Sequence, residues 1–193
     1  GLSAAQADAW REPFGDLTYF RELRLDPFHR HVMARHPDLR RPLETLIAQL
    51  TEADVCLVHG DYSPKNILVA PDGRLILLDY EVAHRGNPLF DVSFCIAHLM
   101  LKGWALDRRE EAAALIGEFL AGYARDAGGL LPHLGALLLA RIDGKSPVEY
   151  IADERLRERV RTVGGRWVRL AGEPAESGPR ERMLQEIRQG LER

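Results

Sequence analysis

Three short apolar runs in the middle of the chain restrict the folds that this sequence can form. They span residues 55–58, 67–69 and 75–78, and each has the length of a β-strand rather than of a helix. The last two flank residues 71–74, a Pro-Asp-Gly-Arg sequence whose residue types favour a tight turn. We therefore expect a β-hairpin in the middle of the chain.

Apolar residues on both sides of this hairpin recur at helical spacing. Before it, a helix is expected around residues 43–50. After it, helices are expected over 90–101, 107–127 and 130–142. The sequence therefore predicts an α+β fold that is mostly helical.

Two places combine a capping residue with a proline at the first helical position. Asp26-Pro27 predicts the start of a helix in the first third of the chain, and Ser146-Pro147 predicts the start of an Arg-rich helix. The two glycines at residues 164–165 predict a break in this second helix.

The length of 193 residues is sufficient for one sizeable core. We expect one domain over residues 1–171, followed by a linker and a C-terminal helix over residues 172–193. Residues 172–179 have the composition of a linker, and the apolar residues beyond them could form one face of an amphipathic helix.

Composition and charge exclude several classes of partner. The chain has 26 Lys and Arg against 29 Asp and Glu, a formal net charge of −3, which provides no strong field for nucleic acid or an anionic membrane. No apolar stretch approaches the ~20 residues of a membrane span. Residues 1–10 lack the features of a signal peptide, and two cysteines cannot form a disulfide framework. We expect a cytoplasmic protein.

Chemistry-bearing side chains gather around the apolar runs. Asp61, Asn66 and Asp79 are expected at the ends of adjacent short strands, where a tight turn can bring polar side chains to one edge. Two carboxylates and an amide provide the hard oxygen ligands that Mg²⁺ prefers, with water and phosphate completing its shell. The pattern indicates phosphoryl transfer.

The same segment resembles a known enzyme family. His59-Gly60-Asp61, with Asn66 five residues after the Asp, is similar to the catalytic loop of aminoglycoside phosphotransferases and choline kinases, the kinase-like small-molecule phosphotransferases. Residues 57–69 would form the catalytic loop and residues 75–81 the metal-binding segment. The resemblance is carried by residues 55–101. It implies a protein-kinase-like C-terminal lobe whose small β-hairpin carries both loops.

The resemblance also implies a role for individual residues. Asp61 would be the catalytic base that orients a substrate hydroxyl and accepts its proton. Asn66 and Asp79 would hold Mg²⁺ on the phosphates of ATP, and Leu68 would form the apolar floor under the adenine. Asp91 would brace the backbone of the catalytic loop from the next helix.

The sequence departs from the family pattern before the catalytic loop. A kinase-like enzyme needs a Gly-rich loop and a Lys on the phosphates, but the first lysine of this chain is Lys65. We therefore expect a C-terminal lobe with its N-terminal lobe absent, inactive by itself, which could form a homodimer through the surface left uncovered. Ser63, two residues after Asp61, favours the small-molecule branch and leaves the γ-phosphate contact unassigned.

Each of these residues also has a plainer interpretation. Asp61 and Asp79 could be ordinary turn or capping residues, and Glu81 could share a metal or be solvated. His59 is expected to be a hydrogen-bonded structural residue rather than a base. The alternative function is a non-catalytic, kinase-like helical module for binding or regulation.

Residues 144–146, Gly-Lys-Ser, match the end of a phosphate-binding loop. The first glycine of that motif is replaced by Leu139 and the preceding residues favour a helix where the motif needs a strand, so a turn between helices, capped by Ser146, is expected.

The acceptor is expected to be the hydroxyl of an aminoglycoside, choline or a sugar-like molecule, and the sequence does not distinguish ATP from GTP. The substrate pocket is expected between the loop after Asp61 and the helices beyond Pro88, and acids in it would suit an aminated substrate. Five candidates to line it are Trp104, Asp107, Tyr150, Asp153 and Glu154.

Overall fold

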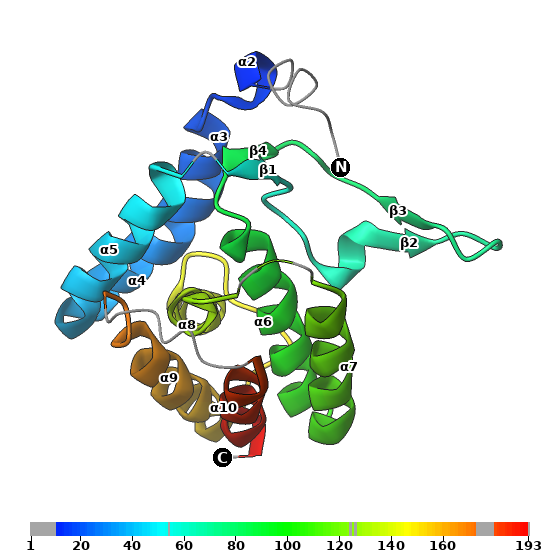
Figure 1. Ribbon diagram of the computed structural model, residues 1–193. Helices are drawn as coiled ribbons and strands as arrows, with labels where there is room; N and C mark the ends of the chain where they lie inside the picture. Colours follow the sequence, from blue (N-terminus) through cyan, green and yellow to red (C-terminus); the bar gives the residue numbers. More distant parts are fainter. Residues whose placement is uncertain (1–10, 54, 124, 126, 173–179, 193) are drawn as a thin grey trace.

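A helical body carries two small antiparallel sheets (Figure 1). The computed structural model describes residues 11–53, 55–123, 125, 127–172 and 180–192. The expectation of a mostly helical α+β fold is confirmed. The predictions made for residues 1–10 and for most of the linker at 172–179 lie outside the described residues.

The helices before the sheets form one layer of the body, and those after them form the rest. The first group comprises α2 (Arg11–Phe14), α3 (Thr18–Phe20), the π-helical stretch η1 (Arg21–Arg30), α4 (His31–Arg35), the 3₁₀ turn η2 (Pro37–Leu39) and α5 (Arg40–Thr51). The second group comprises α6 (Leu89–Ala105), α7 (Arg109–Gly122), α8 (Leu130–Asp143), α9 (Glu154–Val168) and α10 (Arg180–Glu192).

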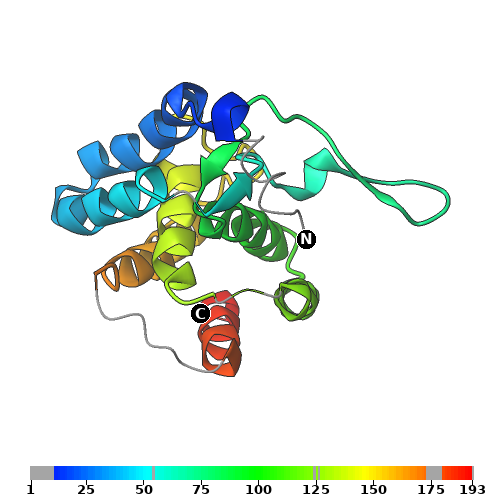
Figure 2. The same cartoon turned by 45° about the horizontal axis from the view of Figure 1, so that its top comes forward.

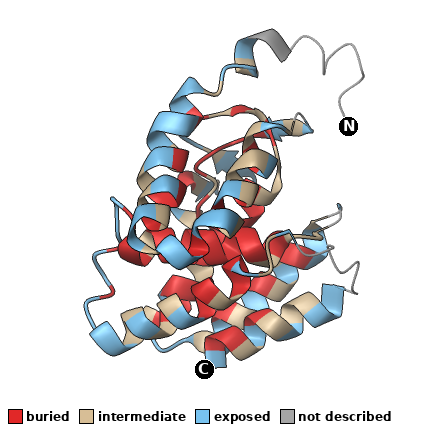
Figure 3. Ribbon diagram, turned by 90° about the vertical axis from the view of Figure 1, so that its left-hand side faces the viewer, coloured by how far each residue is buried: buried red, intermediate tan, exposed pale blue. Residues whose placement is uncertain are grey.

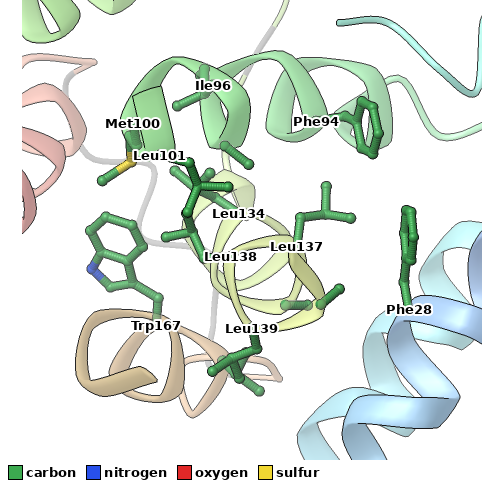
Figure 4. Close-up of a cluster of buried hydrophobic side chains, with 14 of the residues drawn as sticks. Phe28, Phe94, Ile96, Met100, Leu101, Leu134, Leu137, Leu138, Leu139 and Trp167 are labelled. Atoms are coloured by element: carbon green, nitrogen blue, oxygen red, sulfur yellow. The ribbon is translucent and has the colours of Figure 1, made fainter. Parts of the chain in front are cut away.

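Helix α8 lies at the centre of the core. Nearly all of its residues are buried, as the red centre of Figure 3 shows. Its leucines face α6 on one side and α9 on the other, where Met100 and Trp167 pack against them (Figure 4). The continuous apolar stretch of α8 is explained by this position, because a helix covered on all sides has no polar face.

Helices α8 and α9 touch through their backbones. A Cβ atom on Gly135 would lie 2.6 Å from the carbonyl oxygen of Gly164, and a Cβ atom on Gly164 would lie 2.9 Å from the carbonyl oxygen of Gly135. Both distances are shorter than van der Waals contact, so only glycine fits on either side. The predicted break at residues 164–165 is wrong: α9 continues to Val168 because this close contact offsets the low helix propensity of glycine.

We expect Gly135→Ala to destabilise the protein by about 1–3 kcal/mol, because the added methyl group forces α8 and α9 apart. Urea denaturation measures the change. Gly117→Ala on α7 is the matched control: a Cβ atom there would have nothing within 4 Å, and the substitution should raise stability by about 0.5–1 kcal/mol. Equal effects of the two substitutions would contradict the backbone contact.

The first third of the chain differs from the prediction at Pro27. The helix does not begin at Asp26-Pro27; Pro27 lies inside η1, and the side chain of Asp16 accepts a hydrogen bond from the Thr18 amide at the actual start. A proline removes one backbone donor and crowds the preceding turn, which the wider π-helical turn accommodates. The carbonyl of Leu23, four residues before Pro27, accepts a hydrogen bond from the side chain of Arg24 at 2.9 Å in place of the missing proline donor.

The Arg-rich helix also begins later than predicted. Ser146-Pro147 lies in the segment between α8 and α9, and α9 starts at Glu154, where the side chain of Asp153 accepts a hydrogen bond from the Arg155 amide. Asp153 rather than Ser146 caps the helix because the segment before Asp153 is held against α8, where the amide of Val148 donates to the carbonyl of Arg141.

The three predicted strands form two separate sheets. Strand β1 (Cys56–Val58) pairs with β4 (His84–Gly86), while β2 (Ile67–Val69) pairs with β3 (Leu75–Leu77) as the predicted hairpin. The hairpin extends away from the helical body in both views (Figures 1 and 2). Strand β4 has a polar His-Arg-Gly sequence, so no apolar pattern could indicate it.

The C-terminal helix packs into the same core. Ile187 and Leu191 of α10 are buried, and the indole of Trp104 donates to the carbonyl of Leu191 at 3.0 Å. In the part of the chain that the structure describes, no helix combines the length and apolar character needed to cross a membrane.

Two histidines are buried in the core without hydrogen bonds. The ring nitrogens of His29 on η1 and His133 on α8 have no hydrogen-bond partner among the described residues. Burial lowers the pKa of His29 to about 3 and that of His133 to about 4, from an ordinary value of 6.5. Both rings are therefore neutral at pH 7.

The free energy of unfolding should decrease as the pH falls below about 6.5, because the unfolded chain then binds protons that the folded core excludes. We expect a slope of about 1.4 kcal/mol per pH unit for each of the two histidines. Urea denaturation between pH 7 and pH 5 measures this slope. The variant His29→Leu should reduce it by about 1.4 kcal/mol per pH unit, the contribution of one proton. An unchanged slope in that variant would show that His29 takes up no proton on unfolding.

Candidate active site

The loop after β1 is held by one carboxylate. Asp91, in the first turn of α6, accepts hydrogen bonds from the backbone amides of His59 at 2.7 Å and Gly60 at 2.9 Å. Burial raises the pKa of Asp91 to about 6, although the two amides favour its charged form. Gly60 adopts φ +78°, and a Cβ atom there would lie 2.6 Å from the carbonyl oxygen of Val82. The expected bracing role of Asp91 is confirmed.

His59 links the loop to the hairpin. Its Nε2 lies 2.9 Å from the carbonyl oxygen of Leu78, and its Nδ1 accepts a hydrogen bond from the Asp61 amide at 3.2 Å. A carbonyl can only accept, so the proton resides on Nε2. Both nitrogens are engaged, which agrees with the structural role expected for His59.

Asp61 is buried and its carboxylate is contacted from three directions. Oδ2 accepts a hydrogen bond from Asn66 Nδ2 at 2.9 Å, lies 3.1 Å from Lys65 Nζ and lies 3.5 Å from a terminal nitrogen of Arg24. All three contacts involve the same oxygen. The other oxygen, Oδ1, has no partner among the described residues and remains available to a ligand.

Arg24 was missed by the sequence analysis. Its Nε donates to the carbonyl of Gly60 at 2.7 Å, so the residue fixes the catalytic loop as well as contacting Asp61. It comes from η1, far from the motif in sequence. No local pattern marks it.

Asn66 and Asp79 occupy the two sides of the hairpin base. Nδ2 of Asn66 donates to Asp61, which leaves its Oδ1 without a hydrogen-bond partner in the described part of the chain. The amide of Leu78 donates to the carbonyl of Asn66 at 2.9 Å, and Asp79 follows directly. Asp79 is exposed and adopts φ 69°, an uncommon conformation for any residue except glycine.

This arrangement differs in one respect from the prediction. Asp61 follows β1, which belongs to the other sheet, so the three residues do not lie at the ends of strands in one sheet. The structure brings Asp61 and Asn66 into direct contact and places Asp79 across the hairpin base from Asn66. Leu68 lies on β2 with 48% of its surface exposed.

The donor set suits a hard cation. Asn66 Oδ1 and the carboxylate of Asp79 are oxygen donors that no described residue engages, and Mg²⁺ binds through one or two such protein ligands with phosphate and water. Within the described ranges, no group of three or more His, Cys, Asp or Glu residues gathers at a metal site. Two protein ligands do not complete the shell of a cation, so Asn66 and Asp79 fit a cation that is shared with phosphate and water.

A cleft of about 360 Å³ opens beside Asp61. Its apolar wall consists of Leu23, Phe28, Pro64 and Phe94. The rings of Phe28 and Phe94 stack with their centroids 6.1 Å apart, between η1 and α6 (Figure 4). The volume lies at the lower end of the range for small-molecule pockets.

The polar lining of the cleft comes from η1, α6 and α8 of the helical body, from the loop between β1 and β2, and from the segment after α8. Besides Asp61 it contains Arg24, Lys65, His98, Lys102, Arg141, Ser146 and Tyr150. Burial lowers the pKa of His98 to about 4, so its ring is neutral at pH 7. The cleft lies where the substrate pocket was expected, with an additional wall from η1.

Most of the side chains predicted to line the cleft lie elsewhere. Trp104 packs against α10, Asp107 pairs with an arginine at the surface, and Asp153 caps α9. Glu154 pairs with Arg161. Tyr150 does line the cleft. Asp153 and Glu154 were misplaced because they begin a helix whose start was predicted seven residues too early.

The Gly-Lys-Ser sequence at residues 144–146 forms a connection between helices. The amide of Gly144 ends α8 by donating to the carbonyl of Ala140, and the amide of Lys145 donates to the carbonyl of Pro27. The segment follows a helix rather than a strand, so it is not a phosphate-binding loop. Ser146 does not cap α9 but lines the cleft.

Comparison with known proteins agrees with this geometry. A family model described as the phosphotransferase enzyme family (APH) matches residues 3–136, which is well over half of the chain and includes the loop and hairpin described above. The chain therefore belongs to the phosphotransferase enzyme family, as the resemblance predicted. A search of curated proteins returned no match.

We expect Asp91→Ala to lower the free energy of unfolding by about 2–4 kcal/mol, because two backbone amides lose their buried acceptor. Denaturation measures the stability, and hydrogen exchange at His59 and Gly60 should accelerate. Glu118→Ala, at an exposed position on α7, is the control and should change stability by less than about 0.5 kcal/mol. Unchanged exchange at both amides would exclude the bracing role.

Proposed function

We propose that this chain is the catalytic lobe of an ATP- and Mg²⁺-dependent phosphotransferase that acts on the hydroxyl of a small molecule. The observation that carries the proposal is the contact of Asp61 with Asn66 beside the hairpin base, at the wall of a cleft. Family membership supports phosphoryl transfer. The lobe assignment and the residue roles are part of the proposal.

Asp61 positions the nucleophile in this proposal. Its free Oδ1 accepts a hydrogen bond from the substrate hydroxyl and takes the proton as the hydroxyl oxygen bonds to the γ-phosphorus and ADP leaves. Asn66, Lys65 and Arg24 hold Oδ2, which fixes the direction of Oδ1. Catalysis in this class depends on such positioning and on stabilisation of the phosphate charge.

Asn66 and Asp79 would hold Mg²⁺ against the phosphates. The cation, when bound, neutralises the charge on the phosphate oxygens. Asn66 can serve both neighbours at once because its Nδ2 points to Asp61 while its Oδ1 is free. The left-handed backbone at Asp79 supports a functional role, since such strain persists where a site requires it.

The exposed hairpin is the proposed platform for the nucleotide. Leu68, Val69, Leu75 and Ile76 expose between 42% and 70% of their surface. Leu68 would lie under the adenine, and the neighbouring side chains would contact a lobe that supplies the Gly-rich loop and the phosphate-binding lysine. Exposed apolar patches commonly mark such an interaction surface.

The test is phosphotransfer by the full-length gene product with Mg²⁺ and ATP over a panel of hydroxyl compounds. We expect Asp61→Asn to lower kcat by about 10²–10⁴-fold, because the variant cannot accept the hydroxyl proton. Asp79→Asn should weaken Mg²⁺-dependent binding of ATP, measured by titration. Asp72→Asn, at the exposed turn of the same hairpin, is the control with unchanged activity.

Absence of both turnover and Mg²⁺-dependent nucleotide binding in the full-length protein would overturn the proposal. A non-catalytic binding or regulatory module would then be the better interpretation of this chain. Turnover that survives Asp61→Asn undiminished would remove Asp61 from its assigned role.

A further inference from the structure

The cleft beside Asp61 is strongly cationic. It is lined by four cationic side chains, Arg24, Lys65, Lys102 and Arg141, and by a single carboxylate, that of Asp61. Arg24 and Lys65 both contact Asp61 Oδ2, so their charge is already engaged by the carboxylate. The other two cations, Lys102 and Arg141, form no ion pair with a carboxylate among the described residues, so the cleft has more positive charge than its one carboxylate can balance.

Arg141 is held in place by contacts with its neighbours but forms no ion pair among the described residues. It leaves the last turn of α8, and one terminal nitrogen donates to the carbonyl of Ser146 at 2.7 Å. Its guanidinium carbon lies 5.7 Å from the ring centroid of Phe28. Its Nε is buried with no hydrogen-bond partner, and no described carboxylate forms an ion pair with it. Such a cation is costly unless an anion joins it.

Lys102 approaches the same cleft from α6. Its Nζ lies 5.3 Å from the ring centroid of Tyr150, and it forms no ion pair within the described ranges. Lys102 and Arg141, which form no ion pair, therefore belong to different helices and meet at one cavity. Tyr150 and the neutral ring of His98 add groups that can hydrogen-bond to a ligand.

The acids that could receive an amine are engaged elsewhere. Asp143 accepts from Arg161 at 2.9 Å and 3.0 Å and also contacts His36. Glu154 pairs with Arg161 as well. An aminated substrate would thus meet two cations and find only the carboxylate of Asp61, one oxygen of which is already occupied.

We propose that the acceptor substrate is an anionic hydroxyl compound, whose carboxylate or phosphate group binds Arg141 and Lys102 while its hydroxyl reaches Asp61. The inference rests on the proposed function of the cleft. The guanidinium of Arg141 presents a planar set of donors that suits either oxyanion. Phe28 and Phe94 provide an apolar surface for the carbon skeleton of the substrate.

The direct test is titration of the full-length protein with three related hydroxyl compounds: glycerol 3-phosphate, glycerol and choline. It is performed with and without Mg²⁺ and a non-hydrolysable ATP analogue, so that binding at the nucleotide phosphates is separated from binding in the cleft. We expect glycerol 3-phosphate to bind in both conditions. Glycerol and choline should bind at least about tenfold more weakly.

Three variants locate the anion. Arg141→Gln should raise the Kd for glycerol 3-phosphate about tenfold and Lys102→Gln about threefold. Arg155→Gln, an exposed position on α9, is the matched control with unchanged Kd. If Arg141→Gln fails to fold, Lys102→Gln decides, because its side chain holds no backbone group. Tighter binding of choline, absence of anion binding, or a Kd unaffected by the cleft variants would overturn the inference.

Turnover separates this inference from the proposed function. In the assay with Mg²⁺ and ATP, Arg141→Gln should raise the KM for an anionic acceptor about tenfold and leave the KM for ATP unchanged. Preferred turnover of neutral or cationic acceptors would overturn the anionic substrate while leaving a phosphotransferase. If an anion bound through Arg141 but no acceptor were phosphorylated, the proposed phosphotransfer would be wrong while the anion site would remain.

Discussion

The hydrogen bonds from two backbone amides to Asp91 are the interaction on which the site depends. They fix the loop after β1 to the first turn of α6, and α6 packs directly on the central helix α8. The same loop carries His59, whose ring connects the amide of Asp61 to the end of the hairpin. The core of the protein thereby sets the position of the buried carboxylate of Asp61 beside the cleft.

Local signals in the sequence predicted the parts of the fold that local interactions determine. The hairpin at residues 67–77 was predicted because its turn and its strands are adjacent in the chain. The pairing of β1 with β4 was not, since β4 is polar and the pairing depends on contacts distant in sequence. The helix start predicted at Asp26-Pro27 was wrong because the structure around Pro27, not the dipeptide, selects a π-helical turn.

The candidate site divides in the same way. The contact of Asp61 with Asn66 follows from their spacing in one short motif. Arg24, Lys102 and Arg141 come from three different helices, and only the packing of those helices makes them neighbours of one cavity. The positive charge of the cleft consequently depends on the tertiary structure, and the net charge of −3 for the whole chain gives no indication of it.

The isolated hairpin has a consequence for how the protein behaves in solution. A sheet of two strands has two unpaired edges, and in this one the exposed side chains beside those edges are largely apolar. Edges of this kind are templates for pairing with strands of other molecules. Where nothing covers it, a hairpin of this kind favours association between molecules, and a charged residue in place of the exposed Val69 would oppose that association without touching the core.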